Sequence, residues 1–203
     1  MTTLSIATPH GPARAELHCC PEGRAALLLG HGAGGGTAAP DLVAATRAAV
    51  AAGVHVALVE QPYRVAGRRA PAPARQLDAA WLTVAEELAI GVFADLPLVF
   101  GGRSSGARVA CRTAAEGGAC AVLCLAFPVH PVGRPEKSRM PELDSVDVPV
   151  LVVQGEWDPF GRPEPTPGRE VVLLAGDHTL GADPGDLGRT VSEWLERRLR
   201  LLD

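Results

Sequence analysis

The sequence lacks the features that mark a secreted or membrane-inserted chain. Its N-terminus has neither the charged segment nor the continuous apolar segment of a signal peptide. No apolar run approaches the roughly 18 residues that a membrane-spanning helix requires. We therefore expect a cytoplasmic protein that contacts no membrane.

The sequence also lacks a positive charge balance and a pattern of paired cysteines. Its 19 basic and 23 acidic residues give a net charge of −4, so no global basic field would recruit nucleic acid. The five cysteines are odd in number and form no C-x-x-C pair, which argues against a disulfide framework or a zinc site. We expect no nucleic-acid partner, no metal and no cofactor, and the oligomeric state is left open.

What remains is typical of one globular domain that spans residues 1–203, with 47% apolar and 21% charged residues. Two short alternating strands are expected at 4–7 and 13–18, followed by apolar strands that alternate with helices. The apolar strands lie at 25–29, 54–59, 97–100, 121–126, 148–153 and 170–174, and the helices at 41–52, 76–93, 107–115 and 185–202. This order predicts an α/β domain with a mostly parallel sheet. Residues 62–75 and 127–141 are expected to be loops.

The stretch Gly102-Arg103-Ser104-Ser105-Gly106 reads G-x-S-x-G between an apolar strand and a helix. A nucleophile elbow needs this context, because the serine sits on a sharp turn where strand and helix backbones approach closely. The alternative is a serine that merely caps the following helix. We take Ser104 as the candidate nucleophile.

Two further residues follow later apolar strands, where α/β sheets bind ligands. Asp158 follows strand 148–153, and His178 follows strand 170–174. The order Ser…Asp…His is that of α/β-hydrolases. An imidazole must take the serine proton, and a carboxylate must hold that imidazole in one tautomer. Glu156 or Asp177 remains open as the acid; His31 and His130 also lie in end loops.

The loop Gly30-His31-Gly32-Ala33-Gly34-Gly35-Gly36 follows the strand at 25–29. An oxyanion hole needs two backbone N–H groups, and in this arrangement one comes from the residue after the nucleophile and one from this loop. We expect Ser105 and Ala33 to supply them, with His31 bracing the loop. The alternative, a phosphate cradle, is disfavoured because the loop lacks the nucleotide-binding motifs.

These motifs together resemble the α/β-hydrolase superfamily, in particular its compact, capless, dienelactone-hydrolase-like group. The sequence is also similar to a small α/β-hydrolase-like family that includes a subunit of the NSL histone acetyltransferase complex and a testis-expressed protein. The similar stretches are 31–34, 60–69, 101–104, 127–131, 133–137, 154–161 and 176–178. The resemblance implies an α/β-hydrolase fold without a cap domain and a triad of Ser104, Asp158 and His178. Unlike the usual pattern, residues 161–167 are too rich in proline for the helix that separates the last two strands.

The resulting prediction is a serine hydrolase that cleaves an ester or thioester of a small molecule. The alternative is a catalytically silent member of the fold that serves as a binding module, because one fold hosts many functions. Arginines cluster in the elbow and in two end loops, which suggests an anionic substrate. The expected substrate contacts are His31, Tyr63, Arg64, Arg103, His130 and Trp157.

Overall fold

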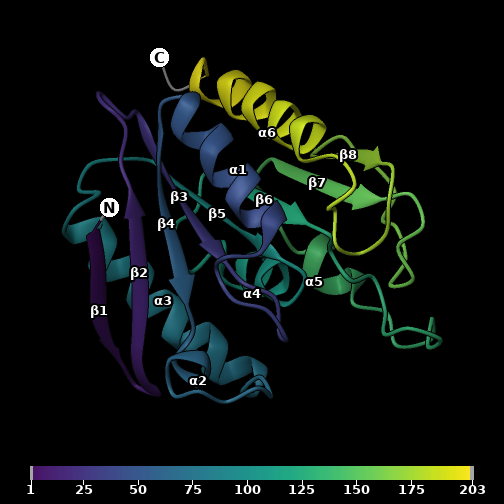
Figure 1. The fold of residues 1–203 in the computed structure, drawn as a ribbon, viewed down its shortest axis with the longest axis horizontal. Coiled ribbons are helices and arrows are strands. Elements are labelled where there is room, and N and C mark those ends of the chain that lie inside the picture. Colours follow the sequence, from purple (N-terminus) through teal and green to yellow (C-terminus); the bar gives the residue numbers. More distant parts are fainter. Residues whose placement is uncertain (1, 202–203) are drawn as a thin grey trace.

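One eight-stranded sheet organises the chain in the computed structural model, which describes residues 2–201 (Figure 1). The strands are β1 (Thr2–Thr8), β2 (Gly11–His18), β3 (Ala25–Gly30), β4 (Val54–Glu60), β5 (Leu98–Arg103), β6 (Ala121–Leu125), β7 (Val150–Gly155) and β8 (Arg169–Leu174). Their order across the sheet is β1-β2-β4-β3-β5-β6-β7-β8. The β1–β2 and β2–β4 pairs are antiparallel, whereas every pair from β4 to β8 is parallel.

Helices cover both faces of the parallel part of the sheet (Figure 1). They are α1 (Pro40–Ala51), α2 (Pro62–Val65), α3 (Ala74–Ile90), α4 (Ser105–Thr113), α5 (Met140–Asp144) and α6 (Pro184–Leu199). α1 and α6 pack together on one face, over a core that includes Leu27 and Trp194. α3 and α4 cover the other face, with Trp81 edge-on to Phe100. Strands buried on both faces explain the continuous apolar runs in the sequence.

The parallel strands all end at the same edge of the sheet, and this edge carries the candidate site. β3 leads into the glycine-rich loop, β5 into Ser104, β7 into Asp158 and β8 into His178. The segment between β6 and β7 contains only loop and the five-residue helix α5. No cap domain therefore covers this edge within the part of the chain that the structure describes.

The predicted order of strands and helices is confirmed, and two predicted loops are shorter than expected. Residues 62–75 contain α2 and the start of α3, and residues 127–141 include the start of α5. In both α2 and α5 a proline occupies one of the first helical positions. Proline fits there, because the first N–H groups of a helix have no internal partner and its φ suits the helix. Residues 161–167 contain no helix, as predicted.

A search for long apolar helices among residues 2–201 finds no candidate membrane span.

Candidate active site

Ser104 lies at the junction of β5 and α4 in a conformation that few non-glycine residues adopt. Its φ is 52° and its ψ is −108°, and its N–H donates to Leu125 O on β6 at 2.8 Å. The flanking glycines are required by close backbone contact. A Cβ at Gly106 would lie 2.3 Å from Gly30 O, and one at Gly102 would lie 2.5 Å from the carbonyl carbon of Gly106. This geometry is that of a strained strand-to-helix turn with an outward serine.

The three residues that the sequence analysis grouped lie in hydrogen-bond contact. His178 Nε2 is 2.9 Å from Ser104 Oγ, and His178 Nδ1 is 2.7 Å from Asp158 Oδ2. The second bond places the imidazole proton on Nδ1, because the carboxylate only accepts. Nε2 therefore carries the free lone pair, which faces the serine hydroxyl. Glu156 and Asp177 do not contact the imidazole; Asp177 Oδ1 instead accepts from Thr179 N and Oγ1.

The Asp158 carboxylate is buried and receives hydrogen bonds at both oxygens. Oδ1 accepts from Phe160 N at 2.8 Å, and Oδ2 accepts from Gln154 Nε2 at 2.8 Å as well as from His178. Gln154 Nε2 also lies 3.0 Å from Phe127 O and 2.8 Å from Gly161 O. The Phe160 ring packs against the imidazole with 4.2 Å between ring centroids. The carboxylate and the imidazole are thus held from several sides before any ligand arrives.

The two expected oxyanion donors lie in the loop after β3 and at the start of α4. Ser105 opens α4, so its N–H has no carbonyl partner within the helix. Among residues 2–201, neither the N–H of Ser105 nor that of Ala33 has a hydrogen-bond acceptor. Tyr63 Oη donates to Ala33 O at 3.0 Å, which fixes the loop from its carbonyl side.

His31 was expected to brace the glycine-rich loop, and both His31 and Tyr63 were expected to contact substrate. Both residues are buried. His31 Nε2 accepts from Gln61 N at 3.1 Å, and His31 Nδ1 donates to Gly32 O at 2.8 Å. Burial lowers the pKa of His31, which favours this neutral tautomer. With both imidazole nitrogens and the Tyr63 hydroxyl hydrogen-bonded, these side chains brace the glycine-rich loop.

Arg103 was also expected to contact substrate, and its guanidinium forms hydrogen bonds within the protein. Nε donates to Asp41 Oδ2 at 3.0 Å, and Nη2 donates to His178 O at 3.3 Å. Burial raises the pKa of Asp41, an effect opposed by Arg103 and by the Leu42 N–H. The buried carboxylate at the start of α1 takes the arginine as its counter-ion.

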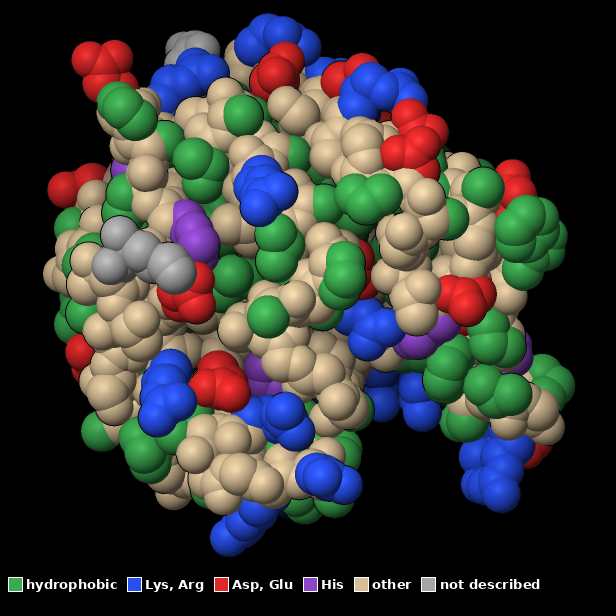
Figure 2. Space-filling view, viewed as in Figure 1, with side chains coloured by type: hydrophobic (Ala, Val, Ile, Leu, Met, Phe, Trp, Pro, Cys, Tyr) green, Lys and Arg blue, Asp and Glu red, His purple; other side chains and the backbone are tan. Residues whose placement is uncertain are grey.

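The other expected substrate contacts keep accessible surface near the site. Trp157, next to Asp158, is 70% exposed. Arg64 is half-buried; its Nη1 donates to Arg68 O at 3.4 Å, and its Nε is buried without a partner. His130 is half-buried and its Nδ1 donates to Pro131 O at 3.0 Å. Figure 2 shows a hollow at lower right, between the body and a protruding arm, with Lys and Arg side chains on both sides.

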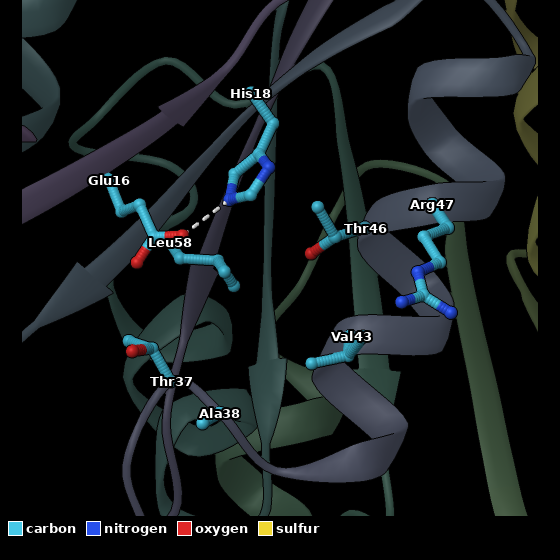
Figure 3. A pocket seen from close by; sticks show the side chains of 8 residues that line it. All are labelled: Glu16, His18, Thr37, Ala38, Val43, Thr46, Arg47 and Leu58. Atoms are coloured by element: carbon cyan, nitrogen blue, oxygen red, sulfur yellow. Dashed lines mark hydrogen bonds and ion pairs between the residues drawn. The ribbon is translucent and has the colours of Figure 1, made fainter. Parts of the chain in front are cut away.

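The cavity shown in Figure 3 lies elsewhere, between β2 and the flank of α1. Its volume is about 250 Å³. The lining residues are Glu16, His18, Thr37, Ala38, Val43, Thr46, Arg47 and Leu58, and Glu16 pairs with His18 at 2.8 Å. None of these residues belongs to the constellation around Ser104.

The chain belongs to the alpha/beta hydrolase domain family, which it matches over residues 23–184. No curated protein sequence matches it. Its fold is similar to that of an α/β serine hydrolase without a lid from Xanthomonas campestris, with a TM-score of 0.79 and 20% identity over 97% of this chain and 94% of that one. It is also similar to Est1E from Butyrivibrio proteoclasticus (TM-score 0.79, 16% identity, covering 98% and 100%) and to dienelactone hydrolase from Anabaena variabilis (TM-score 0.75, 18% identity, covering 97% and 96%).

Three residues of the site were missed by the sequence analysis, namely Gln154, Phe160 and Asp41. Gln154 offered a signal, because an amide at the end of the apolar run 150–153 is buried only when it has partners. Asp41 resembles an ordinary acidic residue in the first turn of a helix, where negative charge is favourable. Nothing local connects it to an arginine 62 residues further along the chain.

Proposed function

We propose that this protein is a serine hydrolase that cleaves a small-molecule ester or thioester through an acyl-enzyme. The observation that carries the proposal is the continuous hydrogen-bonded series from Ser104 Oγ to His178 Nε2 and from His178 Nδ1 to Asp158 Oδ2. A serine hydroxyl becomes a useful nucleophile only beside a base that is itself held in one tautomer.

In the proposed first step, Ser104 Oγ attacks the substrate carbonyl while its proton moves to His178 Nε2. The N–H groups of Ala33 and Ser105 stabilise the negative charge that develops on the carbonyl oxygen. The Asp158 carboxylate stabilises the imidazolium, which then gives its proton to the leaving alkoxide or thiolate. Water, activated by the same imidazole, hydrolyses the acyl-enzyme and returns Ser104 to its starting state.

We further propose that the substrate carries negative charge. Arg68, Arg69, Arg134 and Lys137 are exposed, and Arg139 is half-buried. Arg64 and Arg139 have no carboxylate partner among residues 2–201. Burial and the Arg108 guanidinium lower the pKa of Arg139, and these two effects outweigh the opposing effect of the Glu142 carboxylate. Arginine suits carboxylate and phosphate groups because its donors form a fixed fork.

The hydrolase proposal is tested with a fluorophosphonate probe and a panel of esters. The wild type should be labelled and should hydrolyse at least one ester, whereas Ser104→Ala should do neither. Ser192→Ala, which removes an exposed serine on α6, is the matched control and should behave as wild type. A wild type that neither reacts with the probe nor turns over any ester would favour the alternative of a silent binding module.

The charge proposal is tested with paired esters of equal size, one neutral and one carrying a carboxylate. The anionic ester should have the lower KM, and the preference should weaken between low and high salt because exposed charges are screened within about 10 Å at 0.1 M. Arg64→Gln should raise the KM of the anionic ester only. Arg200→Gln, at the far end of α6, is the control. Equal KM values for the two esters at low salt would refute the idea.

A further inference from the structure

Arg103 contacts three separate segments of the candidate active site with one side chain. It precedes Ser104 directly, so its backbone is part of the elbow. Its Nε donates to Asp41 Oδ2 at 3.0 Å, at the start of α1. Its Nη2 donates to the carbonyl of His178 at 3.3 Å, and its Nη1 lies so close to Gly32 that a Cβ there would approach to 2.7 Å.

The contact with His178 acts on the backbone of the proposed base rather than on its ring. The ring is already held by Asp158 at Nδ1 and by Phe160 against its face. The ring position nevertheless depends on where the backbone of residue 178 lies, and β8 ends four residues earlier, at Leu174. Arg103 therefore links the backbone of the loop that carries the base to the strand that leads into the nucleophile.

The Asp41 carboxylate fixes the arginine in turn. The Asp41 side chain is only 1% exposed, and the Arg103 side chain 18% exposed, so little water competes for the ion pair. Asp41 Oδ1 accepts from Leu42 N at 2.8 Å, which anchors the carboxylate to the first turn of α1. A guanidinium can meet a carboxylate, a carbonyl and a glycine backbone at once because its donors point in fixed directions in one plane. An ammonium group has no such fork.

We propose that Arg103 and Asp41 form a positioning pair that holds the base-bearing loop in register with Ser104. The inference rests on the proposed hydrolase function for its effect on rate, but the positioning itself has a readout that needs no turnover. A hydrogen-bonded Nδ1–H of His178 gives a far-downfield proton resonance, and His178→Ala identifies it. This signal reports the contact of His178 with Asp158 in the resting protein.

The main test compares Arg103→Lys with Arg108→Lys, both folded as judged by circular dichroism. Arg108 is the matched control, because it also forms a part-buried ion pair from the same chain region, to Glu142 on α5, and its side chain has no hydrogen bond to a triad residue. In Arg103→Lys the downfield signal should vanish or broaden. The rate of fluorophosphonate labelling and the kcat for an activated ester should fall by about 10²-fold with little change in KM, as expected for a misplacement near 1 Å. Arg108→Lys should retain both.

Each outcome decides the proposal separately from the hydrolase function. If the signal is lost in Arg103→Lys but even the wild type is not labelled, the positioning pair stands and the hydrolase proposal fails. If Arg103→Lys keeps the signal and stays within twofold of the wild-type labelling rate, or if the wild type has no such signal, the positioning proposal is overturned.

A second variant covers the case in which Arg103→Lys does not fold. Arg103→Gln combined with Asp41→Asn removes both charges, so no carboxylate is buried without a counter-ion. The positioning proposal predicts that this double variant folds and lacks the downfield signal. Retention of the signal, or failure of both variants to fold, would assign the pair a purely structural role and overturn the proposal.

Discussion

Asp158→Asn is the substitution for which the structure gives the most detailed expectation. All three neighbours of the carboxylate are donors: His178 Nδ1 and Gln154 Nε2 at Oδ2, and Phe160 N at Oδ1. An asparagine amide has one accepting oxygen and one donating nitrogen. In either orientation, the NH₂ group of the new amide therefore faces at least one hydrogen-bond donor.

The two orientations differ in what they do to the imidazole. With its nitrogen at the Oδ2 position, the amide opposes both Gln154 and His178, and the imidazole proton must move to Nε2, where it blocks proton transfer from Ser104. With its nitrogen at the Oδ1 position, the amide opposes only the backbone N–H of Phe160, which costs roughly 1–3 kcal/mol for the unmet hydrogen bond. Gln154 therefore favours the second orientation, which keeps the useful tautomer.

The expected loss of activity is large in either case, because the negative charge beside the imidazolium is gone. Removal of one oxyanion-hole donor, which also takes away electrostatic stabilisation of the transition state, lowers kcat by about 10²–10³-fold in another serine hydrolase. The same acid-to-amide change in chymotrypsin-type proteases, where the tautomer is wrong, lowers it by about 10⁴-fold. We expect Asp158→Asn to fall between these limits.

The measurement is kcat for an activated ester near pH 7.5, together with the rate of fluorophosphonate labelling. Asp177→Asn is the control, because Asp177 adjoins His178 in sequence but bonds only Thr179, whose N–H and hydroxyl lower its pKa. This control should stay within about twofold of the wild type. An Asp158→Asn variant within tenfold of wild type would refute the reasoning and the assignment of Asp158 as the acid.

Three further predictions concern stability, each measured by urea unfolding. The free energy of unfolding of Ser104→Gly should exceed that of Ser104→Ala by about 1 kcal/mol, because glycine adopts a positive φ without strain. Equal stabilities would show that the backbone at residue 104 is not strained. Gly106→Ala should lower the free energy of unfolding by about 3 kcal/mol or prevent folding, because its Cβ would clash with Gly30 O. Gly34→Ala should change the stability little, because a Cβ at Gly34 would have open space around it. Glu142→Gln should lose roughly 2 kcal/mol at pH 7. Burial opposes ionisation of Glu142, but two arginines outweigh it and lower its pKa, so this difference should vanish as the pH falls through that lowered pKa.

The order of the elements was predictable because the parallel strands are buried on both faces and read as continuous apolar runs. The junctions at Ser104, Asp158 and His178 were predictable for a related reason, since ligand-binding side chains follow the carboxyl ends of such strands. Helix and strand ends were placed less well. The helix expected at 76–93 ends at Ile90, and the first turns of α2 and α5, each with a proline among its first two residues, were taken for loop.

The roles of the polar side chains around the triad were not predictable from position alone. Arg103 ends β5 and His31 lies in the loop after β3, at the edge of the sheet where a substrate contact is also expected. A side chain that holds the structure differs from one that is free to contact a ligand by having a hydrogen-bond partner remote in sequence. This partner is Asp41 for Arg103 and Gln61 for His31. Such pairings follow from the packing of α1 and α2 against the sheet edge, and one sequence contains no record of them.

The missing helix between β7 and β8 explains why the acid loop depends on so many polar contacts. Two neighbouring parallel strands are usually connected by a crossover that contains an α-helix. Here residues 156–168 contain none, and side chains bond to the loop backbone instead. Gln154 lies within hydrogen-bond distance of Gly161 O, Arg162 bonds to Glu156 O, and Arg169 bonds to Glu164 O. The Gln154 amide at the end of β7 therefore holds both the loop and the Asp158 carboxylate with the same nitrogen.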